Sequence, residues 1–186
     1  MGINLATQVT LIRIILVPVF IICMIRGYPE WALVTFCVAA LTDGIDGFIA
    51  RSMKQKTALG SILDPLADKL LLTTAFVGLA FKYDHLVWII VVIVSRDVIL
   101  SIGALLIYLT GAKFEFKPNI SGKITTFAQI VMVALALLGE GLHHPEFLKT
   151  DKFLYWAYLT ALLTVISGFT YIRRGLEWLL EQTTKP

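Results

Sequence analysis

The chain has 186 residues, of which 58% are hydrophobic and 16% are charged, and its mean hydropathy is +0.81. A soluble domain carries about 25% charged residues, so this composition excludes an ordinary soluble enzyme and predicts an integral membrane protein. The formal net charge of +3 is too small to indicate a nucleic-acid partner, and membrane topology explains the basic residues better.

The predicted fold is an all-α integral membrane protein, a single domain over residues 1–186 with short loops. Residues 1–7 are weakly amphipathic, and we expect them to lie at the membrane interface. Pro18 falls inside the first apolar run, where a membrane helix tolerates it as a kink. Six apolar runs are predicted transmembrane helices, over residues 9–25, 31–49, 62–81, 86–109, 123–138 and 153–172.

The basic residues alternate between the connecting loops. The connectors at 51–57 and 110–123 hold three Lys or Arg each, and so does the tail after residue 172. The remaining connectors hold one, one and two. Since cytoplasmic loops are enriched in Lys and Arg, both termini and the 51–57 connector are predicted to face the cytoplasm, with the protein in the inner (cytoplasmic) membrane.

Four aspartates interrupt the apolar sequence at the cytoplasmic ends of the second and third predicted helices. Asp43 and Asp46 are three residues apart and Asp64 and Asp68 are four apart, so each pair shares one helix face. A short connector makes the two helices antiparallel neighbours, and the four carboxylates are expected to converge. Charged groups at membrane depth cost about 2.5–3.5 kcal/mol each, a cost that divalent cations would offset. All-oxygen ligands favour Mg²⁺ or Mn²⁺, and a pair of such ions suits an in-line phosphoryl displacement.

The arrangement of these residues resembles the signature of the CDP-alcohol phosphotransferase family. It reads Asp43-x-x-Asp46-Gly47-x-x-Ala50-Arg51, then eight residues, then Gly60-x-x-x-Asp64-x-x-x-Asp68. All eight signature positions are filled at the family's spacing. The resemblance implies a membrane enzyme that transfers a substituted phosphoryl group from a CDP-linked donor, here CDP-diacylglycerol, to an alcohol and releases CMP.

The same resemblance implies roles for individual residues. The four aspartates would bind two metal ions, and Asp68 would also be the catalytic base. Gly47, Arg51 and Thr57 match positions that contact the CDP donor, and the small residues Ala50 and Gly60 would let the donor approach the backbone closely. Family members are typically homodimers, so a homodimer among membrane lipids is expected.

The acceptor alcohol has to be predicted from other polar residues. Glycerol 3-phosphate is the favoured acceptor because four cations are available for its phosphate, namely Arg13, Arg96, Lys123 and Arg173. Thr10 and Arg13 resemble the opening motif of the phosphatidylglycerophosphate synthase branch of the family, although Thr7 stands where that motif has Asn. The alternative reading of Arg96 is an internal ion pair with Asp97.

Phosphatidylglycerol is the second acceptor that the sequence leaves open. Arg96-Asp97 with its neighbours, and the segment from Lys117 to Lys123, also resemble the cardiolipin synthases of this fold. Ala104 stands where the first branch carries a further arginine. From a different class of protein, a cation transporter using the acidic cluster is a remote alternative, which the absence of an internal repeat disfavours.

Overall fold

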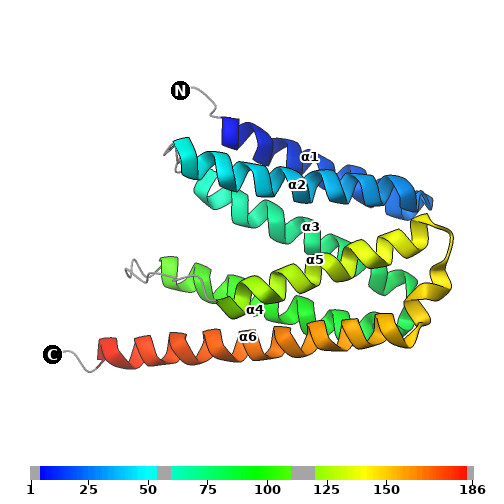
Figure 1. Cartoon of the computed structure of the whole chain (residues 1–186). Helices are drawn as coiled ribbons and strands as arrows, with labels where there is room; N and C mark the ends of the chain where they lie inside the picture. Colours follow the sequence, from blue (N-terminus) through cyan, green and yellow to red (C-terminus); the bar gives the residue numbers. More distant parts are fainter. Residues whose placement is uncertain (1–4, 54–59, 110–119, 184–186) are drawn as a thin grey trace. The chain divides into compact units, whose positions relative to one another are not determined.

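The computed structural model describes the backbone of residues 5–53, 60–109 and 120–183, and the side chains of residues 12–42, 69–103, 120–175 and 177. Within these ranges every regular element is a helix and no strand occurs (Figure 1). The predicted all-α fold is therefore confirmed for the described part of the chain. In chain order the elements are α1 (Leu5–Arg26), α2 (Pro29–Met53), α3 (Gly60–Lys82), η1 (Asp84–Leu86), α4 (Val87–Leu109), α5 (Ile120–Gly141), η2 (Pro145–Lys149) and α6 (Asp151–Thr183).

The α-helices lie on the predicted apolar runs but extend beyond them. α2 continues to Met53, past Arg51, where the sequence predicted a connector. α6 runs unbroken to Thr183, so the predicted span to residue 172 and the short helical tail predicted after it form one helix. Residues 5–7 belong to α1, so this part of the predicted interfacial segment continues the first helix. Hydropathy marks where a helix is apolar, but backbone hydrogen bonding continues through polar residues of good helix propensity.

Three helical segments are long and apolar enough to cross a membrane. They are Asp84–Gly103, Ile120–Gly141 and Asp151–Gly175, and Pro29–Thr42 is a shorter apolar helix. This result concerns only the described residues. It supports a membrane protein, while spanning by all six helices stays a prediction.

The chain divides into two compact units. The first comprises Met1–Lys82 and Val133–Thr150, and the second comprises Tyr83–Met132 and Asp151–Pro186. The first unit therefore holds α1, α2, α3, the C-terminal part of α5 and η2. The second holds η1, α4, the N-terminal part of α5, and α6.

The C-terminal ends of α1 and α5, both in the first unit, use the same capping arrangement. At the end of α1, Gly27 has φ +72°, its N–H donates to the Met24 carbonyl, and the Tyr28 N–H donates to the Cys23 carbonyl. His143, with φ +58°, occupies the equivalent position after α5. These paired bonds form a Schellman motif, which satisfies the last helical carbonyls and reverses the chain sharply. The turn after α1 thus makes α1 and α2 neighbours.

The first unit is built by α1 packing against both α2 and α3 (Figure 1). The rings of Phe20 and Phe36 meet at a centroid distance of 6.2 Å and are buried. Buried alanines at Ala32, Ala39 and Ala75 allow the helix backbones to approach closely. This packing brings the helix that carries Arg13 against the two helices that carry the aspartates.

The second unit is built by α4 packing against α6, with the start of α5 bonded to α6. A buried polar seam runs through this unit. The Thr125 hydroxyl donates to the Leu163 carbonyl at 3.1 Å, and the Gln129 side-chain amide donates to the Thr164 hydroxyl at 3.4 Å. In an apolar environment such interhelical bonds fix the register of the helices.

Candidate active site

The aspartate motif lies on two helices of the first unit. Asp43 and Asp46 belong to α2, and Asp64 and Asp68 belong to α3. α2 and α3 contact each other, and the helical backbone under both pairs agrees with the predicted shared faces. The side chains of all four aspartates lie outside the described residues, so their convergence stays a prediction.

The predicted donor-binding residues are placed in the same way. Gly47, Ala50 and Arg51 continue along α2, and Gly60 is the first residue of α3. Their side-chain surroundings, and the whole of Thr57, lie outside the described residues. Where side chains are described, no group of three or more His, Cys, Asp or Glu residues could hold a metal ion.

Arg13 is buried within the first unit. It lies on α1 and is 1% exposed, and α1 packs against both aspartate helices. A buried guanidinium is costly unless charged or polar partners compensate it. Arg13 belongs to the same unit as the aspartates, whereas Arg96 belongs to the second unit.

Arg96 is held between α4 and α6 in the second unit. Its Nη1 donates to Asp97 Oδ1 at 2.6 Å, and its Nη2 donates to Ser167 Oγ at 2.6 Å. The ring of Tyr171 lies 5.8 Å from the guanidinium carbon, within the range of a cation–π contact. The ion pair with Asp97, predicted as the alternative role of Arg96, is therefore present. It does not exhaust the guanidinium, because Arg carries five N–H donors.

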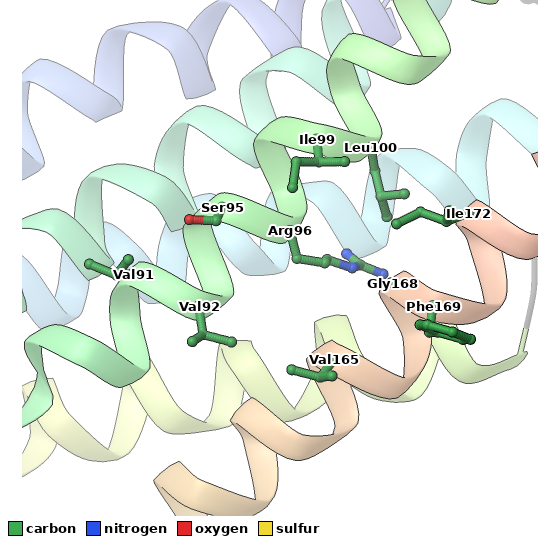
Figure 2. A pocket seen from close by; sticks show the side chains of 10 residues that line it. All are labelled: Val91, Val92, Ser95, Arg96, Ile99, Leu100, Val165, Gly168, Phe169 and Ile172. Atoms are coloured by element: carbon green, nitrogen blue, oxygen red, sulfur yellow. The ribbon is translucent and has the colours of Figure 1, made fainter.

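Arg96 also lines an apolar groove of about 360 Å³ between α4 and α6. Figure 2 shows its side chain extending from α4 toward Gly168 on α6, with Val165 and Phe169 nearby. The buried Nε of Arg96 has no hydrogen-bond partner among the described residues. The guanidinium is thus paired with Asp97 and keeps one buried N–H that no described residue satisfies.

The N-terminal part of α5 reaches the same place through Gly122. A Cβ at this position would lie 2.8 Å from Tyr171 Oη, closer than real contacts allow. Lys123 follows directly and is exposed. Tyr171 therefore lies against Gly122 on α5 as well as beside Arg96 on α4. Arg173 is also on α6 but is highly exposed, and its Nε donates to Glu177 Oε1 at 3.0 Å.

Sequence reasoning did not find Ser167, Tyr171 or Gly122. A signal was present in α6, where polar residues recur every three or four positions through an apolar helix, at Thr160, Thr164, Ser167 and Tyr171. This spacing marks one helix face. It does not reveal that the face meets Arg96, which is 71 residues from Ser167 in the sequence.

Comparisons with known proteins agree with the aspartate motif. The model of the CDP-alcohol phosphatidyltransferase family matches residues 3–170. The CDP-diacylglycerol–glycerol-3-phosphate 3-phosphatidyltransferase of Escherichia coli K12 is 34% identical, covering 98% of this chain and 100% of the relative. The Bacillus subtilis protein of the same name is 33% identical, with 94% and 96% covered. A probable phosphatidylglycerophosphate synthase of Mycobacterium tuberculosis is also 33% identical, with 94% and 82% covered.

The chain belongs to the CDP-alcohol phosphatidyltransferase family, since the family model matches most of its length and relatives above 30% identity align from end to end. The predicted family and the predicted enzyme class are thereby confirmed.

Proposed function

Because the chain belongs to this family, we propose that it transfers the phosphatidyl group of CDP-diacylglycerol to a hydroxyl of glycerol 3-phosphate, forming phosphatidylglycerophosphate and CMP. The observation that carries this proposal is the end-to-end similarity to relatives named for that reaction, in E. coli and B. subtilis. The complete eight-position motif supports the donor half of the reaction.

We assign the binding of the CDP-diacylglycerol donor to the first unit. Asp43, Asp46, Asp64 and Asp68 would hold two Mg²⁺ or Mn²⁺ ions, since hard cations prefer carboxylate oxygens and the family generally uses divalent ions. When bound, such ions stabilise the charge that develops on the donor diphosphate and on the leaving CMP. The chain's own contribution is to place four carboxylates on two contacting helices.

Asp68 would act as the base that takes the proton of the acceptor hydroxyl, because a neutral alcohol is a poor nucleophile. Arg51 would bind a donor phosphate oxygen through its fork of N–H groups. Gly47, Ala50 and Gly60 would leave room for the donor beside the backbone, and Thr57 would add a hydroxyl contact.

The acceptor phosphate would be bound by cations, with Arg96 the best supported of them. The guanidinium is oriented by Asp97 and Ser167 and keeps N–H groups that these bonds do not use. Lys123 would supply the net positive charge that the Arg96–Asp97 pair lacks. Arg13 and Arg173 complete the proposed acceptor set, Arg13 from within the first unit and Arg173 at the end of the α6 span.

We place this activity in a six-span, single-domain protein of the cytoplasmic membrane, with its active site facing the cytoplasm and with a homodimer as the working form. The alternation of basic loops supports the orientation. To test the orientation, a reporter enzyme that works only in the cytoplasm is fused after residue 186, and we expect this fusion to be active. If it is inactive, while a fusion to a reporter that works only outside the cytoplasm is active, the orientation is wrong.

The decisive experiment is an acceptor panel with the purified protein. CDP-diacylglycerol and Mg²⁺ are supplied with glycerol 3-phosphate, phosphatidylglycerol, serine or inositol phosphate, and released CMP and the mass of the lipid product are measured. We expect CMP release with glycerol 3-phosphate and a product of the mass of phosphatidylglycerophosphate. Cardiolipin formation from phosphatidylglycerol instead would overturn the acceptor assignment, and CMP release with none of them would overturn the reaction.

A further inference from the structure

On α6, the residues that meet Arg96 lie on one side of the helix, over little more than one helical turn. Ser167, Gly168 and Tyr171 meet successive parts of its side chain. A Cβ on Gly168 would lie 3.0 Å from Arg96 Cγ, so the missing side chain lets the aliphatic stem lie against the helix. Ser167 then binds the end of the guanidinium, and the Tyr171 ring lies beside it.

Ser167 is a buried polar residue of α6. It is fully buried, at 0% exposure, in a helix that is apolar enough to span a membrane. Alanine would pack there without any polar group to satisfy. The hydroxyl accepts a 2.6 Å hydrogen bond from Arg96 Nη2, and a bond with a charged partner is stronger than one between neutral groups. The buried hydroxyl thus holds one end of the guanidinium.

Holding Arg96 at both Nη atoms fixes the plane of the guanidinium. Asp97 binds Nη1 from α4, and Ser167 binds Nη2 from α6. In this plane the Nε–H and the second N–H of each Nη atom keep fixed directions. Bidentate recognition of a phosphate depends on such a fixed fork, and a freely rotating side chain loses entropy when it binds.

We propose that Ser167 is a positioning residue for acceptor recognition: it orients Arg96 from α6, so that α6 controls how tightly the acceptor phosphate is bound. This inference rests on the proposed function only for the identity of the acceptor. Ser167 touches neither the acceptor nor the donor. It acts through Arg96, and its loss changes acceptor affinity without changing donor affinity.

The test compares Ser167→Ala with a matched control, Thr164→Val. Thr164 is also fully buried on α6, about one turn earlier, but its hydroxyl donates to the Thr160 carbonyl and accepts from Gln129. Both variants therefore lose a buried hydroxyl, and only one of these hydroxyls contacts Arg96. With the full-length enzyme in mixed micelles, we expect Ser167→Ala to raise KM for glycerol 3-phosphate about tenfold or more, with KM for CDP-diacylglycerol unchanged. Thr164→Val should leave both KM values near those of the unaltered enzyme.

A double-variant cycle separates positioning from a general structural role. In an Arg96→Lys background the planar guanidinium is absent, so Ser167→Ala should raise KM for glycerol 3-phosphate no further. Two independent structural defects would instead multiply their effects on this KM. An equal rise of KM for donor and acceptor, an unchanged acceptor KM, or multiplied effects in the double variant would overturn the proposal.

Binding of inorganic phosphate can be measured without turnover, as the rise in the melting temperature of the same proteins when phosphate is added. We expect weaker stabilisation by phosphate in Ser167→Ala than in Thr164→Val. If the unaltered enzyme binds phosphate but does not use glycerol 3-phosphate, the proposed function fails and the comparison of the two variants still decides the role of Ser167. If phosphate stabilises both variants equally, the positioning role fails.

Discussion

The ion pair between Lys82 and Glu140 predicts an asymmetric response to mutation in the first unit. Lys82 is the last residue of α3, and its Nζ donates to Glu140 Oε2 at 2.6 Å. The Glu140 side chain is 2% exposed, whereas the Lys82 side chain is 46% exposed. Oε1 of Glu140 is buried and has no hydrogen-bond partner among the described residues. The acid therefore depends on the lysine for compensation, while the lysine has access to solvent.

The difference in exposure between the two side chains decides which substitution lowers the free energy of unfolding more. Lys82→Met leaves a buried carboxylate without its cation, a change that costs about 3–5 kcal/mol of unfolding free energy. Glu140→Gln leaves an ammonium that remains solvated, so only one charge-assisted bond weakens, at about 1 kcal/mol. Lys82→Met combined with Glu140→Leu removes both charges, and this double variant should lose far less than Lys82→Met alone.

The assay is reversible unfolding of the purified protein in mixed micelles by increasing amounts of denaturing detergent, with helicity as the signal. Lys149→Met is the control for loss of an exposed lysine, because Lys149 lies in η2 of the same unit and is exposed. It should change the unfolding free energy by less than about 0.5 kcal/mol. Equal losses for Lys82→Met and Glu140→Gln, or a larger loss for Glu140→Gln, would refute the reasoning.

Three further predictions concern the site. Asp68→Asn should lower CMP release by about 10²–10⁴-fold while retaining most binding of labelled CDP-diacylglycerol; normal turnover would rule out Asp68 as the base. Chelation with EDTA should abolish activity, and added Mg²⁺ or Mn²⁺ should restore it, so activity that survives chelation contradicts the metal site. Gly122→Ala should destabilise the protein by about 1–2 kcal/mol through its clash with Tyr171, although alanine favours helix. Gly103→Ala, where a Cβ meets nothing within 4 Å, should be neutral or stabilising in the same unfolding assay, and equal effects would contradict this account.

Helix positions were predictable because they depend on local properties. Each apolar run that we expected to be a helix is one in the described ranges, since hydropathy and helix propensity act over a few turns. The ends were less predictable: α2 continues to Met53, past the predicted end at residue 49, because backbone hydrogen bonding does not stop at the first polar residue. The turn at Gly27 was readable from its sequence, but the similar cap at His143 was not, because a non-glycine residue seldom adopts a positive φ.

The chemistry of the donor half was predictable for the same reason. The four aspartates act through spacings of three and four residues on helices, and such spacings can be read directly from a sequence. The motif also identified the family, which the comparisons confirmed. The acceptor half differs because its parts come from separate helices. Arg96 was visible as a charge within an apolar run, but its role as an ion pair or as an anion ligand could not be decided.

The helices, the enzyme family and the residues of the aspartate motif could be read from the residues alone, because all of these follow from short-range patterns. The surroundings of Arg96 became known only from the packing of the helices. Packing of α4 against α6 brings Ser167, Gly168 and Tyr171 to an arginine some 70 residues away. It also shows that Arg96 pairs with Asp97 while its Nε has no partner in the part of the chain whose side chains are described. Contacts between distant helices depend on the packing of whole helix faces, which no local spacing encodes.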